Sequence, residues 1–205
     1  MLFRSTRTCA KFLAARYFVH RMLGLNCLLP DVFPDLLCTN WDHLESRRVD
    51  HVTGAYFFIR RNLFNELNGF DPRFFLYFED IDLSLRMSQA GKSSYYLATV
   101  QCYHAGCGSS NHVKARRLFH SLQSRTFYAF KHLGSLDATT LLLATAFIEP
   151  VPRFVHALAK GSLREIQAVA HGYFLFWRAV PGILKGHYRE RIVAVRPEFE
   201  TTRGQ

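Results

Sequence analysis

The sequence predicts an α/β protein with a helical C-terminal region. Residues 49–59 and 94–102 are rich in β-branched and aromatic residues and are expected to form strands. Between them, residues 60–67 and 79–90 have helical periodicity, and residues 113–205 look helical throughout. Strands that alternate with helices are typical of α/β domains, so the fold class rests on these stretches.

The composition fits a globular protein rather than a disordered one. Hydrophobic residues make up 49% of the 205 residues, charged residues 20% and aromatic residues 15%. The five cysteines are odd in number and irregularly spaced, which excludes a disulfide framework and a Cys-x-x-Cys metal pair. We expect them to be reduced thiols.

The net charge of +10 is concentrated in the C-terminal part of the chain. Residues 113–205 contain 14 Lys and Arg against 6 Asp and Glu. A basic surface of this kind favours anionic partners, which include acidic lipid headgroups, phosphorylated substrates and nucleic acid. Because no nucleic-acid reading motif is recognisable, we expect no nucleic-acid partner.

The first 48 residues read as a connecting and helical segment. Five basic residues and no acid fall within residues 1–25, interspersed with apolar residues. An Arg-rich transit peptide and an amphipathic, interfacial helix both fit this pattern. We favour the helix because the segment has no Ser-rich cleavage zone of small residues, and a secretory signal is not expected because Arg and His break its apolar runs.

Three acids, Glu79, Asp80 and Asp82, open the helix expected over residues 79–90. They follow a run of aromatic residues, and carboxylates in a first turn face the positive end of the helix dipole. A single acid there usually only caps the helix. Three acids within four positions, behind an aromatic wall, make the site a candidate for a general base or a metal ligand.

Gly54 lies within the first expected strand, and His104 follows the second. Gly54 interrupts residues 49–59 where a side chain would be in the way of a site. His104 follows residues 94–102 directly and precedes a Gly/Ser-rich loop. Most lone histidines are structural, but this setting would allow an imidazole to join an oxygen-rich divalent-metal site at the edge of the sheet.

The C-terminal part, residues 113–205, is expected to form basic amphipathic helices. Its apolar run at 141–148 is followed by Glu149 and Pro150, and we expect it to be too short to span a bilayer, which takes about 20 residues. The aromatic stretch 172–184 fits either a membrane interface or packing on the domain.

Several motifs in residues 49–112 occur together in one known family. They are Val52-Thr53-Gly54-Ala55, Arg60-Arg61, Asn68-Gly69-Phe70-Asp71, Phe74-Phe75 with Tyr77-Phe78-Glu79-Asp80, Asp82-Leu83 with Arg86, Gly91, and His104 with Gly106, Gly108, Ser109 and Ser110. As a set they resemble the second half of a family 2 glycosyltransferase of GT-A fold. Among these enzymes the chain is most similar to the bacterial, rhamnosyltransferase-like enzymes of cell-surface polysaccharide synthesis.

The resemblance implies a partial GT-A-like fold and inverting transfer of a sugar from a nucleotide-sugar to a hydroxyl of a glycan or lipid-linked acceptor. It implies that Asp80 is the general base and that Glu79 either positions the acceptor or supports Asp80. Substrate-binding roles fall on Gly54, Ala55, Asp82 and Arg86. His104 would lie near a divalent cation, Mg²⁺ or Mn²⁺, which a complete enzyme would use and which this chain need not bind.

The chain also departs from the family pattern. Such enzymes begin with a nucleotide-binding half, and residues 1–48 leave no room for it. We therefore expect a chain of three parts, 1–48, 49–112 and 113–205, that lacks most of its donor site and whose own activity is open. The alternative is a non-catalytic remnant of the fold that binds a membrane surface or a partner. In either case we expect a cytoplasmic protein, peripheral on the inner face of the cytoplasmic membrane through residues 113–190.

Overall fold

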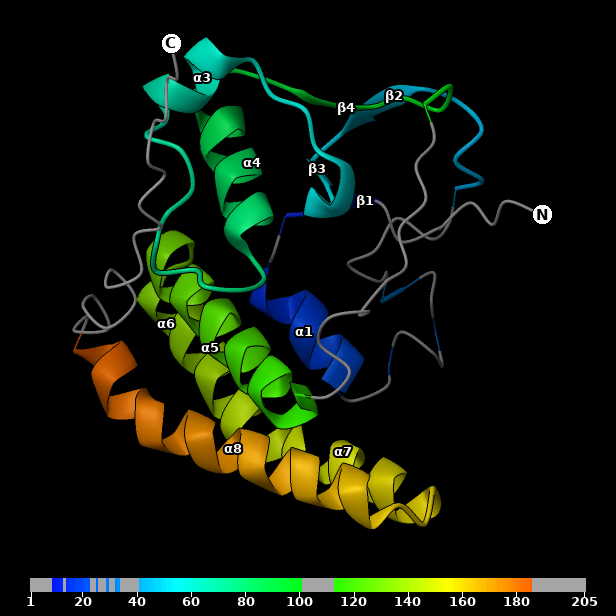
Figure 1. The fold of residues 1–205 in the computed structure, drawn as a ribbon, viewed down its shortest axis with the longest axis vertical. Helices are drawn as coiled ribbons and strands as arrows, with labels where there is room; N and C mark the ends of the chain where they lie inside the picture. Colours follow the sequence, from blue (N-terminus) through cyan, green and yellow to red (C-terminus); the bar gives the residue numbers. More distant parts are fainter. Residues whose placement is uncertain are drawn as a thin grey trace, which may run out of the picture.

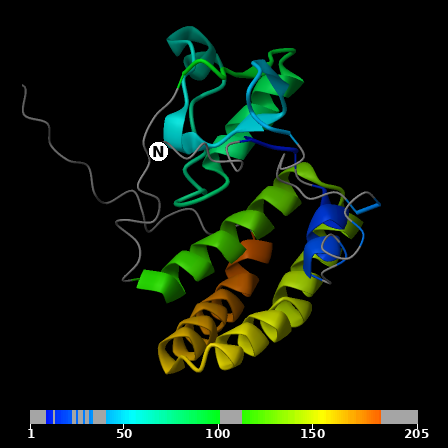
Figure 2. The ribbon, with the colours of Figure 1, turned by 90° about the vertical axis from the view of Figure 1, so that its right-hand side faces the viewer.

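The computed structural model describes residues 9–12, 14–22, 25, 29, 32–33, 41–100 and 113–185. In this part of the chain the fold is mixed α/β, mainly helical, with two small antiparallel sheets. Figure 1 shows the strands with α3 and α4 at one end of the molecule and the long helices α5 to α8 at the other. Figure 2 shows the same separation from the side.

The strands are shorter than the sequence predicts. β2 (Arg47–Val49) pairs with β4 (Ser94–Tyr96), and β1 (Cys9–Ala10) pairs with β3 (His51–Val52). Beyond β3 the chain turns into a short 3-10 helix, η1 (Gly54–Tyr56). The expected strand over residues 49–59 therefore ends early. The Gly54 N–H donates to the Asp80 carboxylate and not to a carbonyl of a neighbouring strand.

Two predicted helices are present in the central part. α3 (Arg61–Glu66) ends at Asn68 and Gly69, which both have left-handed φ angles of 57° and 65°. The Gly69 N–H closes the end of the helix by donating to the Phe64 carbonyl at 2.8 Å. α4 (Glu79–Gln89) carries the three acids in its first turn and is followed by Gly91 at a φ of 73°. Both helix stops were readable because a glycine tolerates this conformation.

The C-terminal part is a layer of helices, as expected. It comprises α5 (Lys114–His132), α6 (Ser135–Leu143), α7 (Pro150–Ala159) and α8 (Leu163–Leu184). At the other end of the chain, α1 (Ala15–Met22) supports the amphipathic helix expected there, and it packs against α6. Residues 186–205, also expected to be helical, lie outside the described part of the chain.

The expectation that Glu149 and Pro150 interrupt the apolar helix is wrong. A π-helical turn, η3 (Ala144–Ile148), joins α6 to α7, and the Glu149 N–H donates to the carbonyl of Ala144 five residues earlier at 2.9 Å. This wider turn leaves room for Pro150, whose ring clashes with the preceding turn of an α-helix. The result is one helix from Ser135 to Ala159, whose length and apolar composition suffice to cross a membrane, although 39% of its most apolar window is buried inside the protein.

One hydrophobic core joins the two ends of the molecule. Tyr128 of α5, Leu141 of α6 and Phe176 of α8 are at most 1% exposed and lie in the same cluster. Phe74 and Ile81, which flank the acidic residues, belong to this cluster too. Burial of side chains of this size stabilises the fold by about 1.5–3 kcal/mol each, so the turn before α4 is anchored on the helical layer.

Candidate functional site

The turn that leads into α4 is conformationally strained. Tyr77 and Phe78 both have left-handed φ angles, 67° and 69°, which cost roughly 1–3 kcal/mol each for residues with a side chain. The turn is held from the helical layer, because the Ser124 hydroxyl donates to the Leu76 carbonyl at 2.8 Å. Strain of this kind is found where backbone must present a side chain in one orientation, and here it precedes Asp80, whose carboxylate contacts Gly54 of η1.

Asp80 is held by backbone N–H groups from two elements. Its Oδ2 accepts from the Gly54 N–H at 2.7 Å, and its Oδ1 accepts from the Ile81 N–H at 2.8 Å. A Cβ atom at Gly54 would lie 3.0 Å from Oδ2 and 3.2 Å from the Asp80 Cβ. Glycine is therefore needed for this close approach, as its place in the sequence suggests. The side chain of Asp80 remains 17% exposed.

His51 is the site residue that sequence reasoning missed. Its Nε2 lies 3.7 Å from the Asp80 Oδ2, and its Nδ1 lies 3.2 Å from the Ser84 hydroxyl. Because that hydroxyl donates to the Asp80 carbonyl at 2.8 Å, it accepts from a protonated Nδ1, which leaves the Nε2 lone pair facing Asp80. Burial lowers the pKa of His51, against the opposing effects of Asp80 and Asp50. Its position three residues before Gly54, within the same expected strand of residues 49–59, was the available signal.

Glu79 lies beside Asp80 in a less polar setting. The side chain is half-buried, and its Oε2 has no hydrogen-bond partner among the described residues. Burial raises the pKa of Glu79, and the neighbouring charge of Asp80 raises it further. The first turn of α4 therefore presents two carboxyl groups with different environments, as an acid or base pair requires.

Asp82 does not face the site. Its side chain is fully buried and contacts three nitrogen atoms, the Arg86 Nε at 2.9 Å, the Lys131 Nζ at 2.6 Å and the His132 Nε2 at 2.7 Å. These contacts lower the pKa of Asp82 despite the effect of burial. They tie α4 to α5, which no pattern within residues 79–90 could reveal.

Arg86 is likewise occupied by the protein. Besides Asp82, it donates to the Leu67 carbonyl at 2.5 Å and to the Gly69 carbonyl at 2.7 Å. The expectation that Asp82 and Arg86 bind substrate gives way to a structural role, because their charged groups are already paired within the fold.

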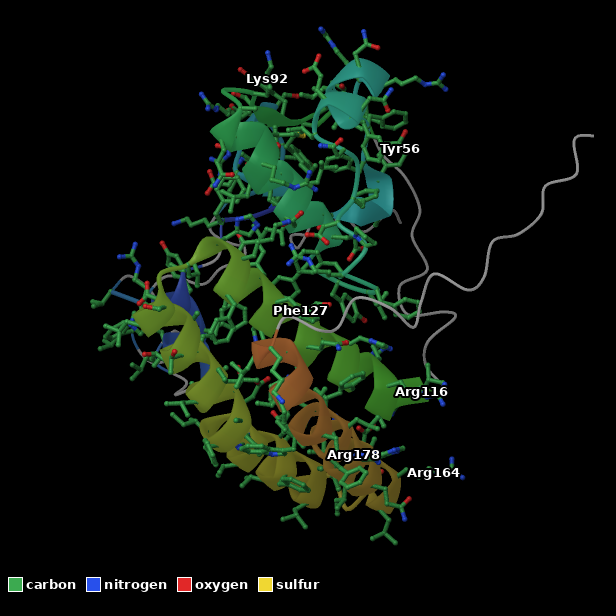
Figure 3. All side chains as sticks on the ribbon, turned by 90° about the vertical axis from the view of Figure 1, so that its left-hand side faces the viewer. Tyr56, Lys92, Arg116, Phe127, Arg164 and Arg178 are labelled. Carbon is green, nitrogen blue, oxygen red and sulfur yellow. The ribbon has the colours of Figure 1, made fainter. Side chains whose placement is uncertain are left out.

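The remaining predicted site residues lie in different settings. Ala55 is exposed on η1, next to Gly54, where Figure 3 shows the neighbouring Tyr56 beside α4. His104 lies outside the described residues. Within the described ranges, no group of three or more His, Cys, Asp or Glu side chains is arranged to hold a metal ion. The metal site expected with His104 therefore stays a prediction.

A cavity of about 280 Å³ opens beside Tyr77, between α5 and α8. Its lining includes three basic side chains, Lys114, Arg117 and Arg153, and one acid, Glu165. Lys114 is paired with Glu165, and Arg153 is paired with Glu149. The Nη1 of Arg117 is buried and has no hydrogen-bond partner among the described residues. The cavity is thus a positively charged space next to the strained turn.

Comparisons with known proteins agree with the resemblance read from the motifs. Residues 38–126 match the family model described as glycosyltransferase like family 2. A segment of 91 residues is 34% identical to the N-acetylglucosaminyl-diphospho-decaprenol L-rhamnosyltransferase of Mycobacterium tuberculosis, and it covers 44% of this chain and 30% of that protein. A segment of 56 residues is 41% identical to rhamnosyltransferase WbbL of Escherichia coli K12 and covers 27% of this chain and 21% of that protein.

No solved structure matches the chain at a significant level. The residues that match the family model include the strained turn, the first turn of α4 and Gly54, since all of these lie within residues 38–126. The chain therefore carries a region of the family 2 glycosyltransferase type, similar to that of rhamnosyltransferases.

Proposed function

We propose that residues 47–100 form the acceptor side of a GT-A-like, inverting glycosyltransferase of cell-envelope polysaccharide synthesis, with Asp80 as its general base. The observation that carries this proposal is the geometry of Asp80. Its carboxylate is held by the Gly54 N–H at 2.7 Å at the start of α4, yet stays partly exposed. Two of about four lone-pair sites on the carboxylate are used, and the others are free to accept from an acceptor hydroxyl.

The chemistry needs one proton to move. The acceptor oxygen attacks the anomeric carbon from the face opposite the leaving nucleoside diphosphate, which inverts that carbon, and Asp80 takes the hydroxyl proton. The neutral His51 beside Asp80, with the Nε2 lone pair 3.7 Å from Oδ2, stabilises the protonated base and offers a path for the proton to leave. Glu79 would position the acceptor, since its Oε2 lacks a protein partner among the described residues.

The relatives suggest the class of acceptor. One of them is named for N-acetylglucosaminyl-diphospho-decaprenol, a sugar joined to a lipid through a diphosphate. We propose an acceptor of this class, a polyprenyl-diphosphate sugar. Arg117, which lines the cavity beside Tyr77 and has an unused donor there, would supply positive charge for the diphosphate, whereas Lys114 and Arg153 in the same lining are already paired with acids.

The donor would be a nucleotide-activated rhamnose or a related sugar, with Mg²⁺ or Mn²⁺ at the leaving diphosphate. We assign no step to the metal, because no three or more His, Cys, Asp or Glu side chains among the described residues are arranged to hold one. Binding of acceptor is therefore the property of this chain that tests the proposal most directly.

The test compares the wild-type chain with Asp80→Asn and Arg117→Gln. We expect a short-chain polyprenyl-diphospho-N-acetylglucosamine to bind wild type and Asp80→Asn with similar affinity in calorimetry, and Arg117→Gln about tenfold more weakly. With nucleotide-rhamnose and Mg²⁺ added, any transfer by wild type should fall at least 100-fold in Asp80→Asn, as expected for loss of a general base. Absence of acceptor binding, or full transfer by Asp80→Asn, would refute the proposal.

The second candidate is the non-catalytic module that binds a membrane surface. The observation that favours it is the large exposed apolar surface of α6, α7 and α8. Lipid binding without acceptor binding would support this candidate over the enzyme.

A further inference from the structure

The helix from Ser135 to Ala159 carries an unpartnered apolar stripe along its full length. Six large apolar side chains on it are each more than half exposed: Leu136, Leu143, Phe147, Val151, Val155 and Leu158. They are spaced by seven, four, four, four and three residues, which places them on one side of the helix. Isolated exposed apolar residues are common, but six of them along about six turns of one helix mark an interaction surface.

The π-helical turn η3 keeps this stripe straight. In a regular α-helix of 3.6 residues per turn, side chains four residues apart drift around the axis by about 40° at each step. In a regular α-helix, the side chains of Phe147, Val151 and Val155 would therefore point progressively farther around the axis from that of Leu143. The wider turn at Ala144–Ile148 takes up part of this drift, so that the exposed apolar side chains of α6 and α7 face the same way.

α8 extends the stripe into a wider surface. Its Phe174 and Trp177 are 55% and 41% exposed, and the Trp177 ring contacts the Phe147 ring with centroids 4.9 Å apart. The six stripe residues together with Phe174 and Trp177 are called the apolar face below. α7 and the first turns of α8 lie at the end of the molecule away from α3 and α4 (Figure 1). The Asp80 site is in α4, so it lies at the opposite end from this part of the apolar face.

The opposite side of the same helix is packed against protein, and it includes two buried polar residues among its apolar core residues. Thr145 is fully buried, and the buried Glu149 pairs with Arg125 of α5 and with Arg153 at 2.6 Å. A helix that crossed a bilayer alone would have to bring this carboxylate into lipid, which is costly. One apolar side and one protein-packed side are instead typical of a helix that lies in the plane of the membrane surface.

The charges around the apolar face favour an anionic surface. Residues 113–185 contain ten Lys and Arg but three acids, of which Glu149 and Glu165 are already paired with basic residues. Lys160 and Arg164 are exposed where α7 turns into α8, and Arg178 lies over the Phe174 ring at 5.6 Å. Figure 3 shows Arg164 and Arg178 at the same end of the molecule, far from Lys92 at the other end. Such basic residues beside exposed aromatic rings match the headgroup region of an anionic bilayer.

We propose that the apolar face docks peripherally in the surface of an anionic lipid bilayer, with the six stripe residues, Phe174 and Trp177 in the acyl boundary and the neighbouring Lys and Arg at the headgroups. This inference goes beyond the proposed sugar transfer and does not depend on it. It also gives a defined lipid-facing side to the peripheral membrane binding that the sequence predicts for residues 113–190.

The chain offers a sharp probe, because it contains two tryptophans and one of them lies in the apolar face. Trp41, which stacks on His43, is replaced in Trp41→Phe so that fluorescence reports Trp177 alone. We expect a blue shift of the Trp177 emission with phosphatidylglycerol vesicles, and quenching of at least half of the signal by lipids brominated near the top of the acyl chain.

The matched variants test the residues of the stripe. Val151→Asp with Val155→Asp should weaken vesicle binding in flotation assays at least tenfold. Phe58→Asp serves as the control, because Phe58 is 82% exposed near the Asp80 end, and it should bind like wild type. Circular dichroism of the full chain checks that each exposed-site variant is folded.

Three results would overturn the proposal. Unchanged flotation of the double variant would show that the stripe does not touch lipid. Binding that 0.5 M salt abolishes, without quenching of Trp177, would show attraction by charge alone. Self-association in lipid-free solution that only the double variant loses, with no vesicle binding by wild type, would show that a second copy of the chain covers the apolar face.

Discussion

Replacing Asp82 with Asn tests whether this acid holds the fold or contacts substrate. The carboxylate is fully buried and lies 2.6–2.9 Å from nitrogen atoms of two cationic side chains, Arg86 and Lys131, and of His132. Asn keeps the size and one oxygen acceptor of Asp but removes the negative charge. The change therefore leaves buried positive groups of α4 and α5 without their counter-charge.

The magnitude follows from what each partner retains. Removal of one member of a buried ion pair costs about 3–5 kcal/mol. Lys131 keeps a second partner, Asp71, at 2.7 Å, and Arg86 keeps the carbonyls of Leu67 and Gly69. We therefore expect the low end of that range, a loss of about 3 kcal/mol in the free energy of unfolding, which is a large share of the roughly 5–15 kcal/mol that stabilises a domain.

Urea denaturation of the full chain, followed by circular dichroism, measures this loss at pH 7. The control is Asp137→Asn, which removes an exposed acid from the first turn of α6 and should cost less than about 1 kcal/mol. Because the pKa of Asp82 is lowered in the fold, its contribution is complete above its ordinary value of 3.8 and is lost as the pH falls through the folded pKa. The difference between wild type and Asp82→Asn should accordingly shrink below pH 4.

A loss below about 1 kcal/mol at pH 7, or a loss equal to that of Asp137→Asn, would refute the structural role. If Asp82→Asn were as stable as wild type and bound acceptor more weakly, the original expectation of a substrate-binding Asp82 would stand.

Four further predictions address the site. Gly54→Ala should disturb Asp80 more than the fold, because the added Cβ lies 3.0 Å from the Asp80 Oδ2. Carboxyl NMR should detect a changed Asp80 signal, while the free energy of unfolding changes by about 1 kcal/mol or less. An unchanged Asp80 signal would contradict the close packing at Gly54. Glu79→Gln should stabilise the chain at pH 7, because burial raises the Glu79 pKa and the ionised form is disfavoured in the fold; this gain in urea midpoint should vanish below pH 4.5, and a loss at pH 7 would contradict it. His51 has a lowered pKa and is favoured neutral, so the stability of wild type should fall as the pH drops below 6.5, and a His51→Asn variant should lose less over the same range in thermal unfolding; equal slopes would exclude His51 as the cause. Calorimetry with nucleotide-sugars and Mg²⁺ or Mn²⁺ should show weak or no binding to this chain, as the sequence predicts, and micromolar affinity would mean that a donor site is built from residues before β2.

Several elements could be predicted because their signals are local. The three acids in the first turn of α4, and the Asn68-Gly69 stop of α3, act through backbone groups only a few residues away. The need for a glycine at position 54 was readable as well, since an interrupted strand indicates close approach by another group. The match of residues 38–126 to family 2 glycosyltransferases confirms the resemblance carried by these motifs.

The length of the strands and of the helix after Gly134 could not be read from composition. Residues 49–59 favour extended backbone, but a strand also needs a partner, and here the Gly54 N–H has a carboxylate instead. Glu149 and Pro150 look like a helix break, yet a π-helical turn carries the helix past them. Both outcomes depend on groups that the local pattern does not contain.

By itself, the sequence determined the similarity of the central region to family 2 glycosyltransferases, the helix that opens with Glu79, Asp80 and Asp82, and the basic, helical character of the C-terminal part. Only the tertiary structure decided what each acid does. It places Gly54 and His51 against Asp80, leaves an oxygen of Glu79 without a described partner, and buries Asp82 among cations from helices up to 50 residues away. The physical reason is that helical periodicity shows which residues share a face, whereas the charge, hydrogen bonds and burial of a carboxylate are set by whichever distant side chains the fold packs against it.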